Sequence, residues 1–483
     1  MIFPLCSSLA LAQDVPEGRE PPARPAAAWT VMIYGAADNN ADGHMLDFLN
    51  KVRGAVADDP GIELVLFIDR STGYSTDAKT FGEDFTGARL YRLGATTAKR
   101  LAGGDEFPEI ALDKDWEADS ADPENLRKFL RFGKARFPAK HHALLIYGHA
   151  DGITLCPDEQ SRHAMGIAEL ADVVTEAESV EFAALELCNM GGVEIAYQWR
   201  PGNGGFSTDV LVAIPNAGPP LDWDRVFARI HTPGHASTNG RDDGLDPSRM
   251  TAQEFGRLVV EEGGRGRRAM AAANPGRRDQ IAHESVGCYD LLAVEEVKGT
   301  VDALAVLLAR HDAKAILEEL CGPGKRGTVM NYVDGRFSGP RPFVDLYDLA
   351  RRCAECDELA PSARAAASAA MKATDDFVLA SFGMDGFENF EPGRNGVFIV
   401  FPAGDGSSAR SAAARTRTFR ESGWADWYAP YEVRREGTSA ANWAWCRDGA
   451  VRGDGSVDNW FELLDSWFDS SDDESGGLNG WRW

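Results

Sequence analysis

The chain of 483 residues is long enough for one large hydrophobic core or for two or three domains. Its 75 acidic and 50 basic side chains give a formal net charge of −25, which excludes nucleic acid as a partner because nucleic-acid backbones bind to basic faces. No run of about 18 apolar residues occurs, so we expect no transmembrane helix. An acidic surface instead attracts cationic substrates, weakly at physiological salt.

The first residues carry part of an export signal. Residues 2–12 combine an apolar run with the small-x-small sequence Ala10-Leu-Ala12, although no basic residue precedes them. We therefore predict a truncated signal peptide over residues 1–12 and an extracytoplasmic or secreted protein; without such a signal the protein would be cytoplasmic. Residues 13–28 are rich in Pro and Ala, which predicts a linker.

Apolar strands alternate with helical patterns in the region that follows. The predicted strands are residues 29–34, 62–68, 88–93, 142–148, 182–188 and 210–215. Strands that alternate with helices favour a mainly parallel sheet covered on both faces, which is a three-layer α/β/α sandwich. We assign this caspase-like core to residues 29–230.

Composition changes beyond the core. Residues 231–280 are polar and rich in Arg and Gly, which predicts exposed loops. Residues 281–430 are predicted to form a helix-rich part packed on the core, with a strand at 397–401 on a sheet edge. Residues 431–483 form a Trp-rich acidic tail, whose tryptophans we expect to pack on the domain surface. Cys353 and Cys356 form a C-x-x-C with no second pair nearby, so we interpret them as structural rather than as a zinc site.

Two chemically reactive residues follow successive predicted strands. His149 follows the strand at 142–148, and Cys188 ends the strand at 182–188, just before two glycines and a helix predicted to begin near Val193. With one helical segment between them (165–179), the two strands form a parallel βαβ unit and lie about 5 Å apart when they are neighbours. A thiol and an imidazole at one sheet edge supply a nucleophile and a proton carrier.

Motifs around these residues resemble the clostripain family of cysteine peptidases, in the caspase-like clan. The opening strand at 29–34 is followed by Ala36-Ala-Asp-Asn-Asn40, the nucleophile stretch is Cys188-Asn-Met-Gly191, and residues 397–402 and the segment with Trp424 are similar to the closing elements. The resemblance covers about residues 28–430. This chain departs from the family at Ala150, where the family normally has Gly after the catalytic His.

The resemblance implies a cysteine endopeptidase. Cys188 would attack the substrate carbonyl as a thiolate, His149 would transfer the proton, and the backbone N–H groups of Ala150 and Cys188 would form the oxyanion hole. This chemistry needs no metal or organic cofactor, and the sequence leaves calcium undecided because no EF-hand pattern occurs. Peptides or proteins are the expected partners of a chain that we take as a monomer.

Substrate specificity and processing can also be predicted. Glu186 lies two residues before Cys188, on the same side of an extended strand. The resemblance implies that a carboxylate at this position receives an Arg or Lys side chain of the substrate, and Asp222 and Asp224 are secondary candidates. The resemblance also implies self-cleavage after a basic residue. We expect the cut between Arg162 and His163, in a polar segment (157–163) predicted to be a surface loop.

Two alternatives remain open at this point. The chain could be an inactive caspase-like fold that acts as a binding module through its Trp-rich tail; Ala150 favours this alternative, whereas the presence of both His149 and Cys188 speaks against it. It could also be an acyl or peptidyl transferase that uses the same dyad, because transfer and hydrolysis share the acyl-enzyme.

Overall fold

The computed structural model describes residues 27–56, 58–152, 154–235, 244–277, 282–321, 328–332, 343–401, 443–449 and 456–468. The strands are β1 (Ala27–Ala37), β2 (Ile62–Arg70), β3 (Gly87–Leu93), β4 (Ala98–Leu101), β5 (Ala139–Tyr147), β6 (Thr154–Asp158), β7 (His163–Gly166), β8 (Val180–Glu186), β9 (Thr208–Ala213), β10 (Ser285–Asp290), β11 (Phe343–Asp345), β12 (Val378–Gly383) and β13 (Phe398–Val400). The helices are α1 (Asp42–Val56), α2 (Pro123–Arg136), α3 (Ile167–Val173), α4 (Val193–Gln198), α5 (Trp223–Phe227), α6 (Ala252–Ala273), α8 (Val294–Arg310), α9 (Lys314–Leu320), α10 (Leu346–Glu355), α11 (Pro361–Phe377), α14 (Ala444–Arg447) and α15 (Trp460–Phe468). The predicted signal peptide and most of the linker lie outside the described residues.

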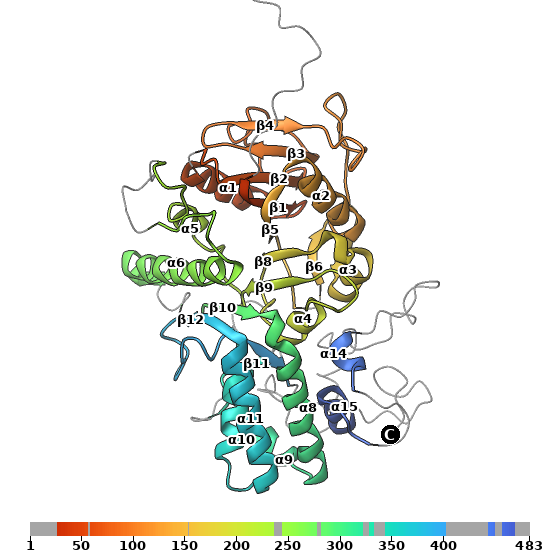
Figure 1. Cartoon of the computed structure of the whole chain (residues 1–483), viewed down its shortest axis with the longest axis vertical. Coiled ribbons are helices and arrows are strands. Elements are labelled where there is room, and N and C mark those ends of the chain that lie inside the picture. Colours follow the sequence, from red (N-terminus) through yellow and green to blue (C-terminus); the bar gives the residue numbers. More distant parts are fainter. Residues whose placement is uncertain are drawn as a thin grey trace, which may run out of the picture.

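Among the described residues, one nine-stranded sheet runs in the order β12-β10-β9-β8-β5-β1-β2-β3-β4 (Figure 1). The five central strands, from β9 to β2, are parallel, and antiparallel strands flank them on both sides. The chain reverses its direction across the sheet after β2, because β2 lies on one side of β1 and β5 on the other. Such a switch point opens a crevice at the carboxyl ends of the strands, where α/β proteins bind their ligands.

The central strands bury side chains on both faces. Along β5, Leu144 and Ile146 point into one apolar core, whereas Leu145 and Tyr147 point into the other. Helices α2, α3, α4 and α8 contribute to the first core, and α1, α5 and α6 to the second. The predicted α/β/α sandwich with a mainly parallel sheet is therefore confirmed. No helix in the described ranges is both long and apolar enough to cross a bilayer.

The predicted loops at 231–280 are wrong where α6 lies. Thr251 Oγ1 accepts from the N–H of Glu254 at 3.2 Å, while Glu254 Oε2 accepts from the N–H of Thr251 at 2.8 Å. This reciprocal pair starts a helix by satisfying two otherwise unpaired donors. The sequence Thr-x-x-Glu was the available signal, and the Arg- and Gly-rich composition obscured it.

The glycines of α6 are buried, and Gly256 and Gly264 face the sheet. A Cβ atom on Gly256 would come within 2.4 Å of Cys288 Sγ, so the helix can lie this close to β10 only with glycine there. Arg267, in the same helix, is 2 % exposed and forms an ion pair with Glu284. The Arg- and Gly-rich stretch of α6 therefore belongs to the helical layer that packs on the sheet.

The part beyond residue 281 supplies strands as well as helices. β10 and β12 belong to the main sheet, so this part shares one sheet with the core instead of only packing against it. Helix α11 ends at Phe377, and the chain continues directly as β12. The strand predicted at 397–401 is β13, which pairs with β11 and touches the nucleophile segment through a bridge between Phe398 and Gly192.

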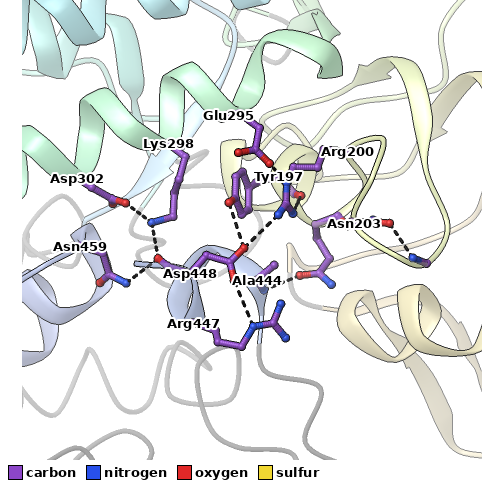
Figure 2. Close-up of polar contacts among 12 residues, drawn as sticks. Tyr197, Arg200, Asn203, Glu295, Lys298, Asp302, Ala444, Arg447, Asp448 and Asn459 are labelled. Atoms are coloured by element: carbon purple, nitrogen blue, oxygen red, sulfur yellow. Dashed lines mark hydrogen bonds and ion pairs between the residues drawn. The ribbon is translucent and has the colours of Figure 1, made fainter. Parts of the chain in front are cut away.

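The C-terminal segment packs on this same region. Trp443, Trp445 and Trp460 are at most 4 % exposed, which confirms the expected packing for these three; the acidic run at 469–474 lies outside the described residues. Figure 2 shows Asp448 accepting hydrogen bonds from Tyr197 and Arg200 near α4. The described part of the tail is therefore built into the domain, not presented as a free tryptophan surface.

Candidate active site

The strand register aligns the two predicted catalytic residues. β5 and β8 are parallel neighbours in which Tyr147 pairs with Glu186, and His149 and Cys188 each lie two residues further along. Both therefore leave the carboxyl edge of the sheet at the same level, as the sequence predicted. The segment between the strands differs from the prediction: it contains the hairpin β6–β7 before the short helix α3.

His149 has a neighbour that the sequence analysis did not single out. Its Nε2 lies 2.6 Å from Oδ1 of Asn40. Partial burial and the nearby His44 lower the pKa of His149, while Glu159 opposes this shift. A lowered pKa keeps the imidazole neutral at pH 7, so that it can accept a proton.

The nucleophile segment is fastened to the chain that follows β9. Cys188 is half-buried, with Sγ 4.0 Å from the carbonyl oxygen of Gly218. Asn189 takes a left-handed conformation (φ 59°) and donates its N–H to Asn216 O at 2.9 Å, and Met190 donates to Ile214 O at 2.8 Å. Helix α4 begins at Val193, as predicted.

Ala150 fits the backbone that the family pattern fills with glycine. It forms an antiparallel bridge with Leu155 and is not among the residues with positive φ, so its Cβ causes no backbone strain. The hydrogen bonds of this bridge run from Cys156 N to His149 O and from Asp151 N to Thr154 O. The bridge therefore does not use the N–H of Ala150.

Glu186 is committed to protein contacts. Its side chain is 5 % exposed, and its two oxygens accept from Leu221 N at 2.8 Å and from Trp223 Nε1 at 2.6 Å. Burial raises the pKa of this carboxyl group, and the two hydrogen bonds oppose the rise. Glu186 thus anchors the loop beside Cys188, a task that the sequence did not predict, and its contact with a substrate stays a prediction.

Asp222 and Asp224 lie at the start of α5, beyond that anchored loop. Oδ2 of Asp222 is buried and, within the described residues, has no hydrogen-bond partner. It packs so closely on Gly266 that a Cβ atom there would come within 1.6 Å. Burial raises the pKa of Asp222, and Arg267 opposes the rise. Asp224 is half-buried in the same turn.

The predicted cleavage site lies on the surface, at the tip of the hairpin β6–β7. Arg162 is exposed and left-handed (φ 57°), between β6 and β7. Ser161 donates its N–H to Asp158 Oδ1 at 2.8 Å, and His163 Nδ1 lies 2.8 Å from Asp119 Oδ2. The tip is therefore tied down on both sides of Arg162.

Beneath this hairpin lies a group of carboxylates that sequence reasoning missed. Asp69 is fully buried, and within the described residues neither of its side-chain oxygens has a hydrogen-bond partner. Burial first, and then the nearby Glu117, Asp158, Asp38 and Asp119, raise its pKa well above the usual value. The described residues hold no group of three or more His, Cys, Asp or Glu side chains arranged for a metal ion.

Comparison with known proteins identifies the family. The model of the clostripain family matches residues 33–467. This chain belongs to the clostripain family. It is 35 % identical over 484 residues to clostripain from Hathewaya histolytica, a match that covers 94 % of this chain and 89 % of that protein. As a clostripain-family protein, it is a cysteine-type endopeptidase with peptide or protein substrates.

A solved structure also has this fold. The chain resembles an inactive zymogen of a C11 protease from Parabacteroides distasonis with a TM-score of 0.50 and 14 % identity, over 83 % of this chain and 96 % of that one. At this identity the likeness concerns the fold alone. The fold is the caspase-like architecture predicted from the sequence.

Proposed function

We propose that the protein hydrolyses peptide bonds through a dyad of Cys188 and His149. The observation that supports this most directly is the register of β5 and β8, which brings the two residues to the same level of one sheet edge. His149 takes the thiol proton of Cys188, the resulting thiolate attacks the scissile carbonyl, and His149 delivers that proton to the leaving amine as the C–N bond breaks. Water then hydrolyses the thioester. The N–H groups of Ala150 and Cys188 stabilise the oxyanion.

Two variants and one thiol reagent test the dyad. We expect Cys188→Ala and His149→Ala each to lower kcat/KM by roughly a thousandfold or more. Cys356→Ala, which removes another half-buried cysteine, is the matched control and should keep full turnover. Full activity of Cys188→Ala would refute the dyad. Turnover before and after EDTA treatment tests whether a metal such as calcium is needed, and an added amine acceptor separates transfer from hydrolysis.

The proposed preference is for Arg or Lys at P1, with Asp222 providing the negative charge. Within the described residues, Oδ2 of Asp222 has no hydrogen-bond partner and can accept from a substrate, whereas both oxygens of Glu186 already accept from Leu221 and Trp223. In a peptide panel with Arg, Lys, Asn, Asp or Leu at P1, Asp222→Asn should lower kcat/KM for Arg and Lys by about tenfold or more and for Leu little. Glu186→Gln should weaken all substrates alike. A selective loss in Glu186→Gln would return the specificity role to Glu186, and a preference for Asn or Asp would refute the basic pocket.

Self-cleavage after Arg162 is the third part of the proposal. Proteases bind extended segments, so the hairpin tip has to open before it can be cut. Arg268 is exposed too, but it lies inside α6, where the helix would have to unwind. We expect purified protein to acquire a new N-terminus at His163, Cys188→Ala to stay a single chain, and Arg162→Ala to be activated slowly. An intact and fully active wild-type chain would refute self-processing.

A further inference from the structure

Asn40 occupies the switch point of the sheet, directly opposite His149. It follows β1, the strand between β5 and β2, and in the parallel register Gly35 of β1 pairs with Tyr147 of β5. Three adjacent strands, β1, β5 and β8, thus deliver Asn40, His149 and Cys188 to one edge. The contact between Oδ1 of Asn40 and Nε2 of His149, at 2.6 Å, joins the first two.

The residues before Asn40 hold its loop rigidly. Asn39 is 2 % exposed; its Oδ1 accepts from Ala41 N at 2.9 Å, and its Nδ2 donates to Ala36 O at 3.2 Å and to Pro157 O at 2.9 Å. Asp38 is 1 % exposed and accepts from Gln160 N through Oδ2 at 2.9 Å. The buried side chains of Asp38 and Asn39 therefore fix where Asn40 can point.

The acceptor at Nε2 has a chemical consequence for the other ring nitrogen. An amide oxygen only accepts, so the neutral imidazole carries its proton on Nε2 when it bonds to Asn40 Oδ1. Nδ1 then keeps its lone pair and can take a proton. The opposite tautomer would present an N–H at Nδ1 and could not act as a base there.

We propose that Asn40 is a positioning residue that fixes the Nε2–H tautomer of His149 and turns Nδ1 toward the nucleophile. This inference rests on the proposed dyad. When His149 takes up a proton during turnover, the Asn40 contact becomes a hydrogen bond to a charged group, which is worth about ten- to hundredfold in rate. The charged and titratable groups facing the ring are His44 of α1 and Glu159 of the hairpin.

Kinetics of two Asn40 variants give the first test. Asn40→Leu should lower kcat about ten- to hundredfold with little change in KM, because it leaves the substrate site intact. Asn40→Asp keeps an acceptor and adds a negative charge, so it should lose less than Asn40→Leu and move the His149 limb of the pH–rate profile upward. Asn50→Ala removes an asparagine of α1 that bonds Thr80, and this control should behave as wild type. Equal losses in both Asn40 variants, without a pH shift, would refute the proposal, because they would mean that the amide donates to the ring or only supports folding.

A measurement without turnover separates this inference from the dyad. With the nine histidines labelled with ¹⁵N in the Cys188→Ala chain, the nitrogen shifts of His149 at pH 8 report which nitrogen carries the proton. We expect the Nε2–H form, and a mixture of both forms when Asn40→Leu is added. An Nδ1–H form in the Cys188→Ala chain would overturn the role of Asn40 even if both dyad variants are inactive. If Cys188→Ala or His149→Ala kept full activity while His149 still carried its proton on Nε2, the proposed function would be refuted and the role of Asn40 in fixing the tautomer would stand.

Discussion

The segments that carry Cys188 and His149, the two sides of the proposed active site, are held by different means. The nucleophile segment is held by backbone hydrogen bonds to the chain that follows β9 and to β13, such as Met190 N to Ile214 O at 2.8 Å and Phe398 N to Gly191 O at 2.9 Å. The histidine side has a backbone bond of its own, from Cys156 N to His149 O at 3.0 Å. In addition, the polar side chains of Asn39 and Asp38 attach its β1 loop to the hairpin that carries Arg162. The difference teaches that backbone contacts place the cysteine, whereas the position of the histidine also depends on side-chain contacts with the hairpin at which we propose self-cleavage.

The largest effect should come from disturbing the rigid side. A Cβ atom on Gly191 would lie 2.8 Å from both N and Cα of Pro215, which are backbone atoms that cannot turn away. Gly191→Ala therefore has to displace the segment with Cys188. A displacement near 1 Å costs roughly a hundredfold in turnover, so we expect a loss of this size in kcat/KM and slower alkylation of Cys188 by iodoacetamide.

Gly54→Ala is the control for this variant. Gly54 lies in α1 with no atom within 4 Å of the added Cβ, so the change should leave turnover as it is. If Gly191→Ala kept wild-type turnover and wild-type alkylation, the nucleophile segment would be as adjustable as the histidine side and the comparison would fail.

The rigid side was also the easier one to predict from sequence. Apolar runs that end in Cys188 and His149 predict parallel strands, and parallel neighbours end at one edge whatever connects them. The partner of His149 could not be assigned in the same way, because Asn40 is 109 residues away in sequence. Local patterns carry no information on contacts between loops that only the sheet order brings together.

The buried carboxylates were beyond prediction for a related reason. Asp69, Asp119 and Asp158 come from separate segments, and each alone resembles an ordinary loop or strand-end residue. The sequence places Glu186 two residues before Cys188, but its bonds to Leu221 and Trp223 depend on how α5 docks. Only the packed structure decides whether such a carboxylate faces a substrate or the protein.

A smaller effect should come from the carboxylates under the histidine side. Burial raises the pKa of Asp69 above its unfolded value, so its favourable contribution is complete below the unfolded pKa, near 4, and is lost as the pH rises through the folded pKa. Asp69→Asn removes this charge and supplies two donors to the neighbouring carboxylates. We therefore expect the melting temperature to rise by a few degrees at pH 8 and by less at pH 5.

Thermal unfolding at the two pH values checks this expectation. Asp105→Asn, at an exposed position, is the control and should shift the melting temperature little at either pH. A lower melting temperature of Asp69→Asn at pH 8 would mean that the ionised carboxylate stabilises this region, which would contradict the expected cost of its burial.

The smallest effect should follow Ala150→Gly, which restores the residue usual in the family. The backbone N–H that the oxyanion needs is present with either residue, and Ala150 takes no positive φ that glycine would relieve. Glycine adds freedom to the unfolded chain and to the bridge with Leu155, which costs about 0.5–1 kcal/mol of stability. We expect a two- to threefold loss of kcat/KM and a slightly lower melting temperature. Gly148→Ala, two residues earlier, is the contrasting variant, because it disturbs a packed contact: its Cβ atom would lie 3.0 Å from Ala36 O and press on the Asn40 loop. A tenfold gain in Ala150→Gly would instead mean that the alanine restrains the oxyanion donor, and the histidine side would then limit turnover.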